Sequence, residues 1–132
     1  MPTDSRDHSD LKHGAMNTVL TFAALAEALT GAALLVIPTI VAQLLFGVEI
    51  AGAAVVLTRF AGISLVALGI ACWPGVTTGH GLPAMLTYST LVMLYLAYLG
   101  VAREFAGILL WPAVAVHAVL SAVLAAARFK RS

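Results

Sequence analysis

The sequence predicts an all-α integral membrane protein, folded as a four-helix bundle, and two observations support that fold class. Hydrophobic residues make up 61% of the 132 residues and charged residues 10%, with a mean hydropathy of +1.01. Soluble domains average about 25% charged residues, so water is not the main solvent of this chain. The second observation is a set of four long apolar runs, each close to the ~20 residues that a helix needs to cross a bilayer.

Proline, glycine and charged residues mark the ends of these runs and predict the elements in order. The predicted spans cover about residues 16–37, 51–73, 82–102 and 105–127. Pro38 ends the first span, and the segment PTIVAQLLFG that it opens reads as a second, short helix, because proline is tolerated in the first turn. This helix is too short to span, so we expect it to lie along the membrane interface. The short connections predict an up-down-up-down order.

The ends of the chain are polar. Residues 1–15 lack periodicity and predict a disordered cytoplasmic tail, followed by a transmembrane domain over residues 16–128 and a short cytoplasmic tail over residues 129–132. Met16 is an alternative start. The aspartates and histidines of the first tail have nothing to hold them in fixed geometry, so we expect no metal site there.

The distribution of basic residues predicts the orientation of the chain. Five lysines and arginines lie next to the two chain termini, before the first span and after the last span, whereas only one, Arg103, lies in the loops on the opposite side. The five are Arg6, Lys12, Arg128, Lys130 and Arg131. Basic residues accumulate on the cytoplasmic side of membranes. Both termini are therefore expected in the cytoplasm.

Glu27, Arg59 and His117 each lie near the middle of a different apolar run. A charge at the bilayer centre costs ~2.5–3.5 kcal/mol even on the lenient insertion scale, so such groups need partners or a polar cavity. At 1.5 Å per residue they lie ~15, ~12 and ~16 Å from the outer ends of their helices, and Tyr95 lies ~10 Å from its own. We therefore expect Glu27, Arg59 and His117 in one layer, with Tyr95 close enough to offer a hydroxyl.

The polar cluster of Glu27, Arg59, His117 and Tyr95 has two interpretations. In the first, Glu27 and Arg59 form a buried ion pair that fixes which helices meet, with His117 neutral. In the second, the cluster lines the site of a small transporter or ligand-binding membrane protein, or relays protons, because Glu and His change charge readily. The molecular function and the small-molecule ligand stay open.

The sequence contains few features that would indicate another class of function. There is no catalytic triad pattern, phosphate-binding glycine loop or pair of buried histidines for haem, so we lean against an enzyme and expect no cofactor and no metal. The net charge of +1 does not indicate a nucleic-acid partner. Cys72 is the single cysteine and is expected to be a small buried apolar side chain. The expected partner is the lipid bilayer, with a second copy or another membrane protein left open.

Three segments carry a resemblance to a known family. The first span ends in VIPTIVAQLLFG, the second contains LTRFAGISLVALGIACWP, and the last reads GILLWPAVAVHAVL. This layout resembles uncharacterised four-span bacterial membrane proteins, broadly DoxX-like, over most of the chain after Met16. The resemblance implies a bacterial inner-membrane location and no assigned chemistry.

Overall fold

The chain is all-helical in the part that a computed structural model describes, namely residues 4–75, 80–103, 105 and 107–129. Its helices are α1 (Asp4–Val36), α2 (Pro38–Phe46), α3 (Ala53–Ala71), α4 (Gly81–Ala102) and α5 (Leu110–Phe129). Apart from α2, each contains an apolar stretch long enough to cross a membrane, which confirms the four apolar helices predicted from the sequence.

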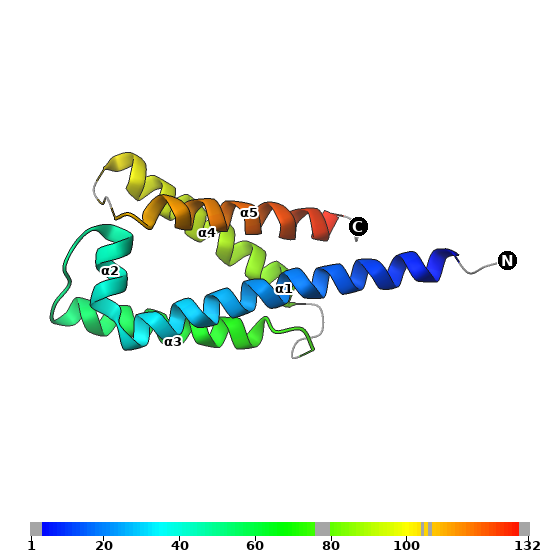
Figure 1. The fold of residues 1–132 in the computed structure, drawn as a ribbon, viewed down its shortest axis with the longest axis horizontal. Helices are drawn as coiled ribbons and strands as arrows, with labels where there is room; N and C mark the ends of the chain where they lie inside the picture. The colour runs from blue at the N-terminus through cyan, green and yellow to red at the C-terminus, as the bar shows by residue number, and fades with distance from the viewer. Residues whose placement is uncertain (1–3, 76–79, 104, 106, 130–132) are drawn as a thin grey trace.

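The four long helices form two pairs. Helix α1 packs mainly on α3, and α4 packs mainly on α5, whereas contacts between the pairs are fewer. Figure 1 shows the pairs as separate layers, with α2 lying between them at one end and the start of α1 extending beyond the other helices at the opposite end. The helices of each pair run antiparallel: Gly31 meets Gly62 while Ala24 meets Gly69, and Gly100 near the end of α4 meets Trp111 at the start of α5.

Glycine allows α1 and α3 to approach closely. A Cβ atom on Gly31 would lie 2.6 Å from the carbonyl oxygen of Gly62, and one on Gly62 would lie 2.7 Å from the carbonyl oxygen of Gly31. One on Gly69 would lie 2.6 Å from the carbonyl oxygen of Ala24. We call Gly31, Gly62 and Gly69 the glycine seam. Because small residues let membrane helices make extensive van der Waals contact, this seam holds the first pair together.

Helix α2 connects the two pairs at one end of the molecule. Pro38 is its first residue, where the missing amide hydrogen costs no helical hydrogen bond, and Gly47 ends it with a left-handed φ of 74°. Its last turn reaches the segment before α5: the amide of Leu109 donates a 2.8 Å hydrogen bond to the carbonyl of Leu44. The rings of Phe46 and Phe105 also meet edge to face, 5.5 Å apart. This end of the molecule is therefore closed by backbone and aromatic contacts.

The apolar core lies nearer the opposite end, where all four long helices contribute. Its buried members are Leu20, Ala23, Ala24, Cys72, Leu82, Met85 and Leu124. Cys72 is 1% exposed, which confirms the prediction of a small buried side chain. The outer surfaces of the same helices are also apolar: Phe22, Phe60 and Val101 are each more than 65% exposed, at 69%, 68% and 74%.

The largest differences between the helices and their predicted bounds lie at two places. The backbone is helical from Asp4, so most of the segment predicted as a disordered tail continues α1; once a helix has nucleated, adding residues at its end costs little. The last helix begins at Leu110 rather than near residue 105, because Gly107 fits directly against the backbone of Leu44 and Leu45 and Pro112 takes a place in the first helical turn.

Candidate functional site

Glu27 is the only acidic side chain in the described parts of the four long apolar stretches, and it is buried. It lies on α1 with 4% of its surface exposed, one turn beyond the core residues Ala23 and Ala24. Its carboxylate faces α4 and α5 rather than α3, which meets α1 through the glycine seam instead. Glu27 therefore faces the interior of the molecule, as a charged group in an apolar run requires.

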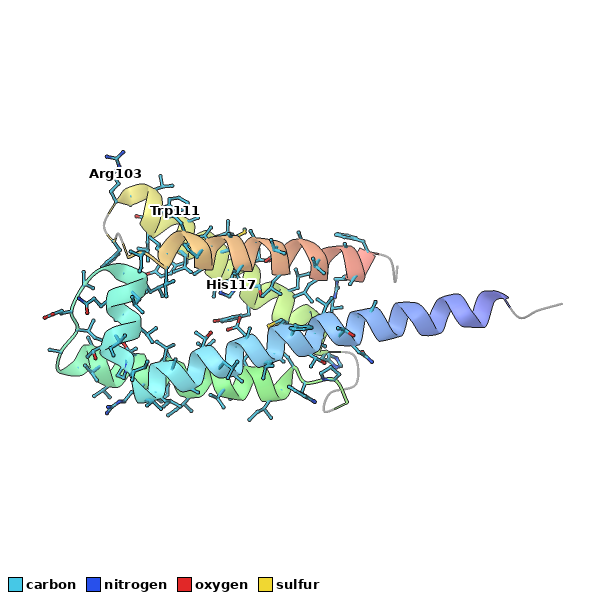
Figure 2. All side chains as sticks on the ribbon, viewed as in Figure 1. Arg103, Trp111 and His117 are labelled. Carbon is cyan, nitrogen blue, oxygen red and sulfur yellow. The ribbon has the colours of Figure 1, made fainter. Side chains whose placement is uncertain are left out.

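His117 on α5 and Tyr88 on α4 complete a three-helix polar centre with Glu27. The Nδ1 atom of His117 lies 3.9 Å from Oε1 of Glu27, and Figure 2 shows His117 on the side of α5 that faces α1. The Tyr88 hydroxyl donates a hydrogen bond to the Glu27 carboxylate. The rings of Tyr88 and His117 meet edge to face, 6.1 Å between centroids. We refer to Glu27, Tyr88 and His117 as the polar centre.

One atom of this centre is left unsatisfied. Nδ1 of His117 is buried and has no hydrogen-bond partner among the described residues, since 3.9 Å to Glu27 is too long for a hydrogen bond. A buried polar atom without a partner costs ~1–3 kcal/mol. At 3.9 Å, the imidazole of His117 and the carboxyl group of Glu27 face each other but form no direct hydrogen bond.

Hydroxyl groups extend the polar centre along α4 and α5. Thr90 donates to the carbonyl of Leu86 at 2.8 Å and lies 3.3 Å from the hydroxyl of Ser121, which is one turn after His117. Ser89 is completely buried, and its hydroxyl has no partner among the described residues. The interface between α4 and α5 therefore carries several polar groups beside the acid of α1.

Arg59 does not join this centre. It is exposed on α3, and no ion pair links it to Glu27 among the described residues, so the predicted buried ion pair is not formed. The reason is rotation about the helix axis. Gly62, three residues on, faces α1 in the glycine seam, and three residues correspond to ~60° around a helix, which turns Arg59 outward.

Tyr95 is also absent from the polar centre, and Tyr88 takes the position expected for it. Tyr95 is 62% exposed, whereas Tyr88, seven residues earlier on nearly the same face, is half-buried. The sequence signal for Tyr88 was a run of four hydroxyl-bearing residues, Thr87 to Thr90, inside an otherwise apolar span. Such a run needs internal hydrogen-bond partners in an apolar environment, and here two of its members have them on neighbouring helices: Tyr88 on α1 and Thr90 on α5.

The chemistry available to the polar centre is hydrogen bonding and proton exchange. A carboxyl group accepts or holds a proton, a tyrosine hydroxyl donates, and an imidazole does either. The described residues contain no group of three or more His, Cys, Asp or Glu side chains arranged to hold a metal ion. The arrangement is thus suited to holding one small polar group in an apolar setting.

The three tyrosines of α4 provide a direct test of the polar centre. Tyr88→Phe should lower the free energy of unfolding by ~1–3 kcal/mol, because it leaves the buried Glu27 carboxyl without its donor. Tyr95→Phe and Tyr98→Phe, both at positions 62% exposed, should change it by less than ~0.5 kcal/mol. Unfolding in mixed detergent micelles, followed by circular dichroism, measures all three. Equal effects at the three positions would contradict the assignment of Tyr88.

In comparisons with known proteins, no protein-family model, curated protein or solved structure matches the chain significantly.

Proposed function

We propose that this chain is a multi-pass protein of a bacterial inner membrane, with its four long helices crossing the bilayer. The large exposed apolar surface supports this, because water does not tolerate contiguous apolar patches of this kind. Exposed hydroxyl groups support it as well: Thr18, Thr21, Thr30, Thr58 and Ser64 each donate to the carbonyl four residues earlier in the same helix. Such internal bonds satisfy polar groups where lipid offers no partner.

The proposed topology is up-down-up-down with both termini in the cytoplasm. The antiparallel packing within each pair supports it, as does Figure 1, where the start of α1 and the end of α5 lie at the same end of the molecule. The basic residues concentrate in the terminal segments. In this arrangement α2 lies along the opposite interface. A DoxX-like affiliation is part of this proposal and rests on the layout of the segments alone.

Reporter fusions test the topology. Fusions placed after Lys12 and after Ser132 should both report a cytoplasmic location, because the positive-inside bias acts on both terminal segments. A fusion in the α2–α3 loop, after Glu49, should report the periplasm. A periplasmic signal from either terminal fusion would contradict the four-span arrangement.

The function that the geometry supports best is binding of a small, mainly apolar molecule at the polar centre. The observation that carries this proposal is the buried acid facing a buried, unsatisfied histidine nitrogen at 3.9 Å. A ligand group that both donates and accepts hydrogen bonds would satisfy the two together. The position supports the proposal further, since ligand sites in helical bundles form between helices, and here two sparsely contacting pairs meet.

An apolar carbodiimide tests whether small molecules reach this centre. Dicyclohexylcarbodiimide adds a protonated carboxylic acid across its C=N bond, and rearrangement gives a stable N-acylurea that retains all the atoms of both reactants. In folded, membrane-embedded protein we expect Glu27 to be modified and the exposed Glu49 to be spared, because the apolar reagent partitions into the apolar surroundings of Glu27 and not into the water around Glu49. Peptide mapping by mass spectrometry locates the adduct.

Two variants control this experiment. Glu27→Gln should abolish the modification, whereas Glu49→Gln should leave it unchanged. If Glu27 reacts only after the protein has been unfolded, the centre is sealed, and it serves to fix the packing of α1, α4 and α5 rather than to bind a ligand. That result would overturn the binding proposal and leave the membrane topology standing.

A further inference from the structure

Arg59 occupies a position that the fold leaves unexplained. It is exposed on the outer face of α3, and neither Glu27 nor Glu49, the two acidic side chains that the structure describes, forms an ion pair with it. Its neighbours on that face, Val56, Phe60 and Ile63, are exposed and apolar, at 66%, 68% and 55%. In a membrane-spanning α3, an unpaired cation would face hydrocarbon, which is costly.

The depth of Arg59 and the direction of its side chain allow the guanidinium to reach the membrane interface. Its Cα lies six residues after Ala53, which is ~9 Å along the axis from the start of the span, while half the hydrocarbon thickness is ~15 Å. Side chains of a helix lean toward its N-terminus, so the guanidinium of Arg59 leans toward the near interface, at the α2 end of the molecule. Long basic side chains reach the headgroup region in this way.

The occupant of this face must combine a long apolar part with an anionic group at the interface. Within the spans of a second copy, no described acidic side chain is exposed, because Glu27 is the only one there and is 4% exposed. Glu49 is exposed, but it lies in the loop before α3, outside the span. A phospholipid has both features, since its tails would lie along Val56, Phe60 and Ile63 while its phosphate meets Arg59. A planar guanidinium binds phosphate oxygens through two parallel hydrogen bonds.

We propose that Arg59 binds the phosphate group of a phospholipid in the leaflet at the α2 end, making the outer face of α3 a lipid-binding surface. This proposal rests on the proposed membrane insertion but not on ligand binding at the polar centre. It assigns Arg59 a role separate from that of Glu27, His117 and Tyr88. The exposed Arg103, at the end of α4, lies outside the apolar stretch and points away from the helices in Figure 2.

Lipid-dependent thermal stability of protein purified in an uncharged detergent tests the proposal. Adding phosphatidylglycerol should raise the melting temperature of the wild type more than adding diacylglycerol with the same acyl chains, which lacks the phosphate. Arg59→Gln should raise the phosphatidylglycerol concentration for half-maximal stabilisation about fivefold, corresponding to ~1 kcal/mol for one basic residue at the headgroups. Arg59→Lys should have a smaller effect. Arg103→Gln, at the same end of the molecule but outside the apolar face of α3, should shift this concentration less than Arg59→Gln does.

Several outcomes would overturn this assignment. Equal stabilisation by the two lipids would show that only the tails matter, and an unchanged response of Arg59→Gln would show that this residue does not bind the phosphate. Full stabilisation by inorganic phosphate, lost in Arg59→Gln, would indicate a site for free anions. A dimer in light scattering that Arg59→Gln dissociates would indicate a protein contact. Carbonate extraction of membranes reads out insertion separately, so its failure would concern the proposed topology.

Discussion

Gly31→Ala should destabilise the protein by about 3 kcal/mol, the upper end of the usual ~1–3 kcal/mol for overpacking. The added methyl group would meet the carbonyl oxygen of Gly62 at 2.6 Å, the amide nitrogen of Val66 at 2.8 Å and Cβ of Leu65 at 2.9 Å. Two of these atoms belong to the backbone, so no side-chain rotation relieves the contact. Helices α1 and α3 would have to separate, which removes van der Waals contact along their whole interface.

Gly14→Ala is a matched control on the same helix. A Cβ atom on Gly14 has nothing within 4 Å, so the substitution should be neutral or stabilise α1 by up to ~1 kcal/mol, through the higher helix propensity of alanine. Unfolding of both variants in mixed micelles measures the difference. If Gly31→Ala were as stable as Gly14→Ala, the close approach of α1 and α3 at the glycine seam would be wrong.

The sequence was sufficient to predict the helices, because length and hydropathy are local properties. Four runs of about 20 apolar residues predicted four long helices, and Pro38 and the glycine of PTIVAQLLFG predicted the position of α2. Glu27 and His117 were placed in one layer by counting residues from the helix ends. The structure brings these two side chains to 3.9 Å, so the depth of these two residues was also predictable.

Rotation about the helix axis was not predictable in the same way. Arg59 and Gly62 lie three residues apart on α3, and counting residues from the helix end gives the depth of Arg59 but not the direction of its side chain. In the structure Gly62 meets Gly31 and Arg59 is exposed, because the seam uses a stripe too narrow to include both. The sequence does not say which helix α3 packs on. It therefore cannot assign a partner to a polar residue, such as Arg59, that lies beside the packed face of α3.

Helix inclination explains why Tyr88 rather than Tyr95 meets Glu27. The depth estimate treated the helices as parallel, whereas Figure 1 shows α4 running obliquely relative to α1 and α5. Seven residues separate the two tyrosines by ~10 Å along α4, so an oblique path brings the earlier residue to the acid and leaves the later one exposed. Crossing angles arise from the packing of one helix on another, and the sequence of a single span does not specify them.

Glu27→Leu should lower the free energy of unfolding by ~1–3 kcal/mol despite the added apolar surface. The Tyr88 hydroxyl would lose its acceptor, and a half-buried donor without a partner costs about that much. His117 Nδ1, already without a hydrogen bond, would also lose the nearby carboxylate. Unfolding in mixed micelles measures the loss, and wild-type stability in this variant would show that Tyr88 has another partner.

Replacing the whole polar centre should reverse this loss. In the triple variant Glu27→Leu, Tyr88→Phe and His117→Leu, no member is left without a partner, and an apolar replacement of a buried polar group is often neutral or stabilising by ~1–4 kcal/mol. We expect the triple variant to be at least as stable as the wild type and to have lost the carbodiimide reaction of Glu27. A site retained for binding at the expense of stability behaves in this way. If the polar centre instead fixes the packing of α1, α4 and α5, the triple variant should be less stable than Glu27→Leu and lose cooperative unfolding, because nothing would then define the register of the two helix pairs.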